Sequence, residues 1–266
     1  MMPVAVPSTA SEYDAFAPFY DGFTARSDYE AWTRHVLELA ERLGLRGRTL
    51  LDLACGTGKS FIPFLRRGFA ITGCDVSGAM LAEAERKAPG AALVHADIRE
   101  LGSIGRFDLV TCFDDSLNYL IEERDLGRAL ASAAANLDPH GLALFDLNTL
   151  LTYRTTFAQD SVSVRDGTVY AWRGESASEA PAGCRAAATI EVFAPRDGNR
   201  YERFTSRHVQ RHHPSERVIA VMERAGLRSL GIHGVREDGS LDRDPDEMRH
   251  PKLLYAARCA KGGDHQ

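Results

Sequence analysis

The sequence has no long hydrophobic run, few cysteines and no excess of positive charge. No stretch approaches the roughly 18 apolar residues of a membrane helix, and the N-terminus lacks the basic and apolar regions of a signal peptide. The five cysteines are odd in number and form no C-x-x-C pair, which argues against a disulfide framework or a metal site such as zinc and for a reducing cytoplasm. A formal net charge of −5 gives no reason to expect a nucleic-acid or membrane partner. Only four of the 32 basic residues are lysines, which is typical of GC-rich bacteria.

Strands and helices alternate through the first half of the chain. Short buried strands are expected at 49–54, 70–74, 92–95, 107–113 and 142–147, with helices at 29–43, 60–67, 78–87 and 125–137. This alternation predicts an α/β fold with a doubly wound, mostly parallel sheet. Residues 161–173, 185–194 and 200–210 instead look like strands joined by short loops, which predicts an antiparallel meander inserted after the fifth strand. A helix at 214–225 and strands at 227–235 and 252–259 complete seven strands in the main sheet.

A strand that runs into a Gly-x-Gly turn is the most informative segment. The sequence LDLACGTG occupies residues 51–58, and neither Gly56 nor Gly58 has a Cβ that would keep a ligand from the backbone. The segment is not a P-loop, because Leu53 stands where the first glycine of that motif belongs. Phe61 likewise replaces the third glycine of a dinucleotide-binding fingerprint. A tight turn without a ligand is the alternative interpretation.

Suitable ligand-binding residues also follow the next three strands. Asp75 ends the second strand, 19 residues after Gly56, where a carboxylate can accept hydrogen bonds from two ribose hydroxyls. Asp97 and Ile98 follow the third strand and could contact an adenine amino group and ring, and Phe113 follows the fourth. Because ligands of open parallel sheets bind beyond the carboxyl ends of the strands, these residues together predict a site for an adenosine-containing ligand.

With HAD at 95–97, FDLVTCFDDSLNYL at 107–120 and LDPHGLALFDL at 137–147, the sequence resembles the class I S-adenosylmethionine-dependent methyltransferases over about residues 10–150. The N-terminal tyrosines, the segment YEAW at 29–32 and the antiparallel insertion further resemble the small-molecule branch, which contains glycine N-methyltransferase and bacterial aminosugar N-methyltransferases. The resemblance implies a Rossmann-like methyltransferase fold. It also implies methyl transfer from S-adenosylmethionine, with S-adenosylhomocysteine as product, to an amine or hydroxyl of a small metabolite, in natural-product metabolism such as antibiotic biosynthesis.

The resemblance also implies roles for individual residues. Asp52 and the two glycines would surround the methionine part of the cofactor, and Val76 would pack on adenine. Tyr13 and Tyr20 would lie over the cofactor in an N-terminal lid, with Arg26 as a carboxylate partner, although its spacing differs from the family's arginine by one residue. The complete set of residues expected at the cofactor is Tyr13, Tyr20, Arg26, Asp52, Ala54, Gly56, Gly58, Asp75, Val76, Met80, Asp97, Ile98 and Phe113.

The expected domain organisation has three parts. Residues 1–44 form the helical lid, and residues 45–158 together with 214–266 form the cofactor-binding domain. Residues 159–213 form the antiparallel insertion, which covers the acceptor, mediates a homodimer, or both. Residues 1–11 and 261–266 are expected to be loose tails.

The mouth of the fourth strand supplies the candidates for catalysis, namely Asp114, Asp115, Asn118 and Tyr119. A hydroxyl acceptor would profit from a positioned base, whereas an amine can lose its proton before it binds. Capping of the following turn is the structural alternative for this segment. The segment lacks the Asn/Asp-Pro-Pro-Tyr/Phe pattern of enzymes that methylate nucleic-acid bases or glutamine amides.

Three histidines, His208, His212 and His213, fall within six residues among several arginines. We expect a solvated basic face here rather than a metal site, and contact with an acidic substrate is the alternative. His95 is expected to be buried in the third strand. A cofactor-binding pseudoenzyme or regulatory protein is the alternative function class, disfavoured by the intact set of glycines and acids. Methylation of RNA or protein is a third possibility, and the negative charge disfavours RNA.

Overall fold

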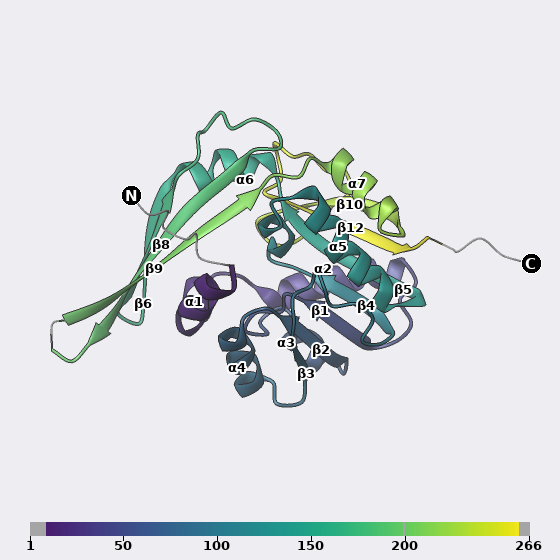
Figure 1. Cartoon of the computed structure of the whole chain (residues 1–266), viewed down its shortest axis with the longest axis horizontal. Coiled ribbons are helices and arrows are strands. Elements are labelled where there is room, and N and C mark those ends of the chain that lie inside the picture. The colour runs from purple at the N-terminus through teal and green to yellow at the C-terminus, as the bar shows by residue number, and fades with distance from the viewer. Residues whose placement is uncertain (1–8, 199, 261–266) are drawn as a thin grey trace, which may run out of the picture.

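The structure is a computed structural model that describes residues 9–198 and 200–260. Within these residues the chain forms a large mixed sheet flanked by helices and a separate antiparallel sheet (Figure 1). The helices are α1 (Thr9–Phe23), α2 (Tyr29–Arg42), α3 (Ile62–Arg66), α4 (Gly78–Lys87), α5 (Glu123–Asn136), α6 (Leu150–Arg154) and α7 (Ser215–Arg224), with 3-10 turns η1 (Ser116–Tyr119) and η2 (Thr156–Ala158). The strands are β1 (Thr49–Leu53), β2 (Ala70–Asp75), β3 (Ala92–His95), β4 (Phe107–Cys112), β5 (Leu137–Asn148), β6 (Asp160–Arg165), β7 (Thr168–Gly174), β8 (Arg185–Arg196), β9 (Arg200–Arg211), β10 (Leu227–Val235), β11 (Leu241–Asp242) and β12 (Lys252–Cys259).

The main sheet has the order β11-β10-β12-β5-β4-β1-β2-β3. Strands β1 to β5 pair in parallel, whereas β12 is antiparallel to β5 and to β10. The predicted doubly wound, mostly parallel sheet is therefore confirmed. Within the described residues the two-residue strand β11 adds an eighth strand at one edge.

Apolar side chains cover both faces of the main sheet. Leu50 and Leu109 face α2, α3 and α4, whereas their neighbours Leu51 and Val110 face α5 and α7. Successive side chains of a strand point to opposite faces, so central strands that are covered on both sides are apolar at nearly every position. This is why β1 and β4 read as short continuous hydrophobic runs in the sequence.

The antiparallel sheet has the order β6-β7-β8-β9 and follows β5 in the chain. We expected one strand over 161–173, and that prediction was wrong, because a hairpin divides this segment. Asp166 and Gly167 both have positive φ, 47° and 79°, and Arg165 pairs with Thr168 across the turn. A two-residue Asp-Gly loop favours a tight hairpin because both residues tolerate the left-handed region.

Helix α1 lies between the antiparallel sheet and α4 (Figure 1). Phe16 packs on Tyr170, Ile190 and Val192 of the antiparallel sheet. On the other side, the Asp14 carboxylate accepts a hydrogen bond from the Ser77 hydroxyl at the start of α4, at 2.5 Å. The helix is therefore held from both sides, above the carboxyl ends of the parallel strands.

Residues 9–11, which we expected in a loose tail, belong to α1. The remainder of the expected tails, residues 1–8 and 261–266, lies outside the described residues. Within the described part of the chain, no helix combines the length and the apolar composition that crossing a membrane requires.

Candidate functional site

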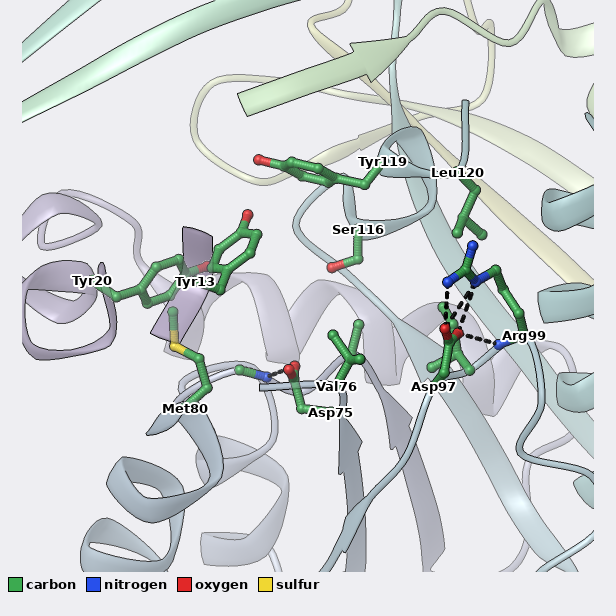
Figure 2. A pocket seen from close by; sticks show the side chains of 13 residues that line it. Tyr13, Tyr20, Asp75, Val76, Met80, Asp97, Arg99, Ser116, Tyr119 and Leu120 are labelled. Carbon is green, nitrogen blue, oxygen red and sulfur yellow. Dashed lines mark hydrogen bonds and ion pairs between the residues drawn. The ribbon is translucent and has the colours of Figure 1, made fainter. Parts of the chain in front are cut away.

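A cavity opens at the carboxyl ends of β1, β2 and β3, with α1 and η1 on its other sides (Figure 2). The chain reverses its order in the sheet between β1 and β4, which is where open α/β sheets bind ligands. The space between its lining residues, open mouth included, is about 930 Å³. Its lining residues are Tyr13, Tyr20, Ala54, Gly56, Asp75, Val76, Met80, Asp97, Ile98, Arg99, Ser116, Tyr119 and Leu120.

Ten of the predicted site residues thus lie together around one cavity, nine of the cofactor candidates and Tyr119 of the catalytic candidates. The sequence reasoning missed Arg99, Ser116 and Leu120. Ser116 and Leu120 belong to the segment that we had singled out after the fourth strand. Arg99 could have been found from its position two residues after Asp97, because an arginine so close to a carboxylate readily pairs with it.

The glycine turn shapes one wall of the cavity. Gly56 has φ +53°, and a Cβ placed on it would meet no atom within 4 Å, so this position faces open space. Gly58 has φ +82°, and its Cβ would lie only 2.7 Å from Cζ of Phe61. Gly56 therefore leaves room for a ligand, whereas Gly58 is required by the packing beneath the turn.

Asp75 links this turn to the start of α4 (Figure 2). Its Oδ2 accepts a hydrogen bond from the Gly56 backbone N–H and its Oδ1 accepts one from the Ser77 N–H, both at 2.8 Å. The side chain faces the cavity and is otherwise surrounded by protein, and this burial raises the pKa of the carboxyl group. The two backbone donors fix the orientation of the carboxylate, which keeps free lone pairs for a ligand.

An apolar surface adjoins Asp75. The Val76 side chain is 37% exposed and points into the cavity (Figure 2). The buried Ile98 lines the same region. A flat ring placed on Val76 would remove this apolar surface from water. Such a surface suits the face of an adenine ring.

Asp97 is engaged by Arg99 (Figure 2). The Arg99 guanidinium donates to both carboxylate oxygens, with Nε 2.9 Å from Oδ2, and its backbone N–H donates to Oδ1 at 2.8 Å. These hydrogen bonds lower the pKa of Asp97. Asp97 therefore lies at the cavity as predicted, but Arg99 already occupies both oxygens that we expected to bind an amino group.

Four of the predicted cofactor residues do not line the cavity, namely Gly58, Asp52, Phe113 and Arg26. Asp52 is buried beneath the turn and accepts hydrogen bonds from the hydroxyls of Ser60 at 2.6 Å and Thr111 at 2.5 Å. Burial raises its pKa to about 7. Phe113 is buried in the core beside α2, and Arg26 is exposed in the turn after α1.

Asp114 and Asp115 form an unusual turn after β4. Both have positive φ, 57° and 51°, which is strained for residues other than glycine. The buried Asp146 carboxylate holds this turn by accepting hydrogen bonds from both backbone N–H groups, at 3.1 and 2.7 Å. Asp114 also accepts a hydrogen bond from the Tyr29 hydroxyl at 2.7 Å, and the Lys252 Nζ lies 2.9 Å from Asp115 Oδ1. Their carboxylates form a charged cluster behind the cavity wall.

Asn118 and Tyr119 have different environments. Asn118 is fully buried; its Oδ1 accepts from the Asn148 N–H and its Nδ2 donates to the Arg211 carbonyl, both at 2.9 Å. It therefore ties β5 to β9. Tyr119 lines the cavity, and its hydroxyl lies 2.9 Å from Nδ1 of His208, a residue on β9.

The predictions of a solvated basic face and of a buried His95 were wrong. His208, His212 and His213 are buried, at 3%, 0% and 4% exposure, because the end of β9 enters the junction between the two sheets. They do not form a solvated basic face. His95 is exposed rather than buried, because β3 is the edge strand of the main sheet, and its Nε2 lies 2.9 Å from the Val76 carbonyl oxygen.

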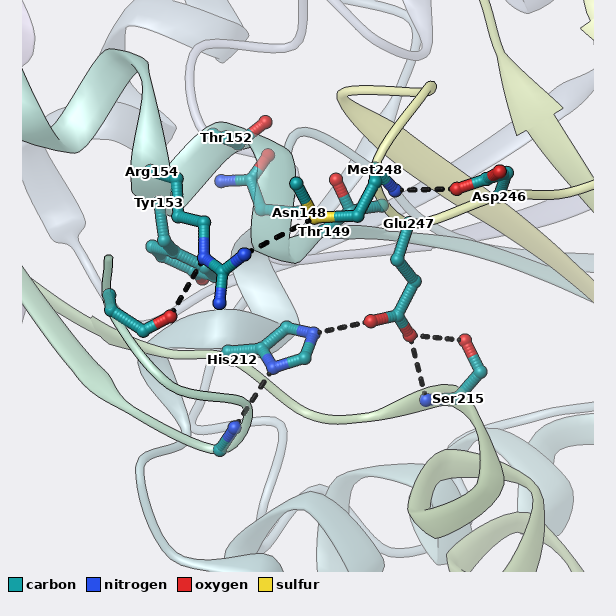
Figure 3. A network of polar contacts seen from close by, with 12 residues as sticks. Asn148, Thr149, Thr152, Tyr153, Arg154, His212, Ser215, Asp246, Glu247 and Met248 are labelled. Atoms are coloured by element: carbon teal, nitrogen blue, oxygen red, sulfur yellow. Dashed lines mark hydrogen bonds and ion pairs between the residues drawn. The ribbon is translucent and has the colours of Figure 1, made fainter. Parts of the chain in front are cut away.

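His212 belongs to a polar network at the junction of the two sheets (Figure 3). Its Nε2 lies 2.9 Å from the Glu247 carboxylate, and its Nδ1 accepts a hydrogen bond from the Gly183 N–H at 3.0 Å. The other carboxylate oxygen of Glu247 accepts from the backbone N–H and the hydroxyl of Ser215. The network fixes the end of β9 to the start of α7. Among residues 9–198 and 200–260, no cluster of three or more histidine, cysteine or acidic side chains is arranged to hold a metal ion.

Comparisons of the sequence and of the structure with known proteins both find methyltransferases. A family profile described as a methyltransferase domain matches residues 50–141. The chain is 30% identical over 259 residues to "Putative methyltransferase YqeM" of Bacillus subtilis, covering 94% of this chain and 98% of that protein. It is also 30% identical over 225 residues to the dTDP-3-amino-3,4,6-trideoxy-alpha-D-glucopyranose N,N-dimethyltransferase of Streptomyces venezuelae, covering 83% of this chain and 92% of that enzyme.

Solved structures resemble the whole fold. A methyltransferase structure from Clostridium acetobutylicum, described as S-adenosylmethionine-dependent, has a TM-score of 0.78 and 27% identity and covers 93% of this chain and 98% of its own. DesVI of Streptomyces venezuelae has a TM-score of 0.71 and 26% identity, with 92% and 98% covered. The antiparallel sheet and α1 are therefore part of the shared architecture. The relatives match nearly the full chain, and the cavity lies where a nucleoside cofactor binds in such sheets; the chain belongs to the S-adenosylmethionine-dependent methyltransferases.

Proposed function

We propose that this enzyme methylates the amino group of a small metabolite, with an amino sugar as the acceptor class. The observation that carries the proposal is the cavity with two unlike ends, Asp75 and Val76 at one and the tyrosines Tyr13, Tyr20 and Tyr119 at the other. The first end suits a nucleoside and the second a polar acceptor. Relatives named as N,N-dimethyltransferases of amino sugars support this acceptor class.

S-adenosylmethionine supplies a methyl group that is already activated on a sulfonium, so the protein has mainly to bind and align the reactants. Asp75 would accept hydrogen bonds from the ribose hydroxyls, while Val76 and Ile98 pack against adenine. Gly56 leaves space beside the backbone for the methionine part. Asp52 and Gly58 support this turn from below rather than touching the ligand.

The acceptor would enter at the tyrosine end. Tyr119 is the residue that we assign to contact with the nucleophile, because its hydroxyl lies at the cavity wall. Asp114 and Asp115 lie behind that wall, where their negative charge favours a cationic amine over an anionic acceptor. Asn118 is buried in backbone hydrogen bonds and would act through the shape of the loop.

The three parts of the chain would divide these tasks. Residues 1–44 would close the cofactor site as a lid, and residues 45–158 with 214–266 would hold the cofactor. Residues 159–213 would cover the acceptor and contribute to a homodimer. We propose that the enzyme works in the bacterial cytoplasm in the biosynthesis of an antibiotic or a related natural product, without a nucleic-acid or membrane partner.

Calorimetric titration with S-adenosylmethionine and S-adenosylhomocysteine, with NAD and ATP as controls, tests the site. We expect micromolar binding of the first pair only. The acceptor class is tested by mass spectrometry after incubation with S-adenosylmethionine and dTDP-3-amino-3,6-dideoxy-α-D-glucopyranose, beside the same sugar with a hydroxyl in place of the amine. Methylation of the amino sugar alone supports the proposal, and methylation of the hydroxyl sugar alone contradicts it.

A further inference from the structure

A chain of hydrogen bonds leads from the cavity wall to the lid helix. The Tyr119 hydroxyl lies 2.9 Å from Nδ1 of His208, whose Nε2 lies 3.0 Å from Oγ of Ser206. The Ser206 hydroxyl donates to the backbone carbonyl of Glu12 in α1, at 3.4 Å. His208 and Ser206 are 3% and 4% exposed, and the chain begins at a residue that lines the cavity. Figure 2 shows the Tyr119 side chain at this wall, next to Tyr13, whose ring centroid is 5.6 Å from that of Tyr119.

The chemistry of the last group determines the direction of every bond in this chain. A backbone carbonyl can only accept, so the Ser206 proton points to Glu12 and the Ser206 oxygen is left to accept from His208. His208 therefore carries its proton on Nε2 and offers a lone pair on Nδ1, provided that the ring is neutral. Burial among aromatic rings, with Tyr13 and Phe16 centroids 5.3 and 5.9 Å away, lowers the pKa of His208 to about 4 and keeps the ring neutral.

From this geometry we infer that His208 is a positioning residue that turns the Tyr119 hydroxyl proton away from the cavity. The Tyr119 oxygen then presents lone pairs to the acceptor. It can hold a nucleophile that carries an N–H or O–H group, and it offers no donor to an acceptor that has only lone pairs. The part of this inference that concerns the acceptor rests on the proposed function, whereas the orientation of Tyr119 does not.

The same chain of hydrogen bonds depends on the position of α1. The Glu12 side chain accepts a hydrogen bond from the Arg207 backbone N–H at 2.9 Å, and this bond fixes α1 against the free edge of β9. Helix α1 also carries Tyr13 and Tyr20, which line the cavity. The orientation of Tyr119 is therefore completed only when the lid helix lies in place, so that closure of the lid and preparation of the acceptor site occur together.

Nitrogen-15 NMR of the full-length protein with labelled histidine tests this inference at pH 7, because the two ring nitrogens report which of them carries the proton. The variant His208→Gln, which lacks this ring, identifies the signals that belong to His208. We expect the neutral Nε2–H form in the wild type and a shift toward the Nδ1–H form in Ser206→Ala and Glu12→Ala. Ser206→Thr should restore the wild-type signal because it retains the hydroxyl. Thr205→Ala, which changes an exposed neighbour on the same strand, should leave the signal unchanged.

An Nδ1–H form or a charged ring in the wild type would overturn the inference, as would a signal that Ser206→Ala leaves unchanged. A second measurement uses the amino sugar as probe, titrated into the complex with S-adenosylhomocysteine. We expect Tyr119→Phe and His208→Phe each to weaken its binding, and the double variant to be no weaker than Tyr119→Phe alone. Additive losses would contradict a shared role. If the amino sugar does not bind to the wild type, the proposed acceptor is wrong, and the histidine signals still decide the orientation.

Discussion

Replacing Asp75 by alanine is the sharpest test of where the cofactor lies. In the structure this carboxylate holds the Gly56 and Ser77 backbone N–H groups with two of its lone pairs and faces the cavity with the others. The substitution Asp75→Ala therefore removes two kinds of interaction at once. It takes the predicted acceptors away from the ribose hydroxyls, and it leaves two backbone donors without their partner.

The two effects have separate magnitudes. A hydrogen bond to a charged group contributes about 1.5–3 kcal/mol, so losing two bonds to the ribose costs about 3–6 kcal/mol. At 1.4 kcal/mol per factor of ten, this corresponds to a dissociation constant raised about 10²- to 10⁴-fold. Gly56 borders the cavity, whereas Ser77 is fully buried and its unpaired N–H costs about 1–3 kcal/mol. We therefore expect the loss of folding stability to remain below the total of about 5–15 kcal/mol that is typical of a domain.

The assay is calorimetric titration with S-adenosylhomocysteine, together with thermal unfolding of the unliganded variant. Asp75→Asn is the milder companion, because its amide oxygen retains one of the two backbone donors. Asp108→Ala is the matched control: Asp108 accepts from the Thr49 N–H and hydroxyl at the opposite end of the sheet, so it should lose stability and keep its affinity. Wild-type affinity in a folded Asp75→Ala variant would refute the placement of the ribose.

Three further predictions concern the turn, the apolar wall and acid stability. Gly56→Ala should weaken S-adenosylhomocysteine binding at least about tenfold and lower the stability by about 1–2 kcal/mol, because its methyl group points into the cavity and φ is positive. Gly58→Ala should instead lose mainly stability, because its Cβ meets the ring of Phe61. The reverse ranking of the two variants in calorimetry and thermal unfolding would contradict this. Val76→Asp should weaken binding by a similar factor without a large change in melting temperature, since a charge there would face an apolar ring. Val162→Asp, at a more exposed valine, is the control. Equal binding by both variants would count against the packing of adenine on Val76. Burial lowers the pKa of His213 to about 4; the unfolded chain therefore binds a proton first as the pH falls from 6.5 to 4, which costs the folded state about 3 kcal/mol. His213→Asn should remove that part of the acid sensitivity in urea unfolding at pH 7 and pH 4, and an unchanged difference between the two pH values would contradict it.

The fold was predictable from the sequence where the local pattern and the tertiary environment agree. Strands β1, β2 and β4 are short apolar runs bounded by turns, and burial on both sides of the sheet gives such runs one interpretation. The hairpin at Asp166 and Gly167 was missed, although Asp-Gly is a strong turn signal. Val162, Val164 and Thr168 to Tyr170 favour strands on both sides of the turn, so the segment resembled one continuous strand.

The site also contains residues that the sequence predicted and residues that it did not. Gly56, Asp75, Val76 and Asp97 follow strand ends, and parallel strands bring their carboxyl ends to one edge of the sheet whatever the intervening loops do. The role of Arg99 was missed although its position two residues after Asp97 is a local signal for their pairing.

The sequence by itself determined the fold class, the family and the nucleoside end of the cavity, because those features rest on short-range patterns: apolar runs, a glycine turn and acids at fixed distances from it. Tertiary structure alone decided the acceptor end. His208 lies 89 residues after Tyr119, and Glu12 lies 194 residues before Ser206, so no local periodicity connects them. They meet because β9 turns back toward η1 and α1 packs against its edge. Burial at that junction then makes three histidines structural where their sequence neighbours suggested a solvated basic surface.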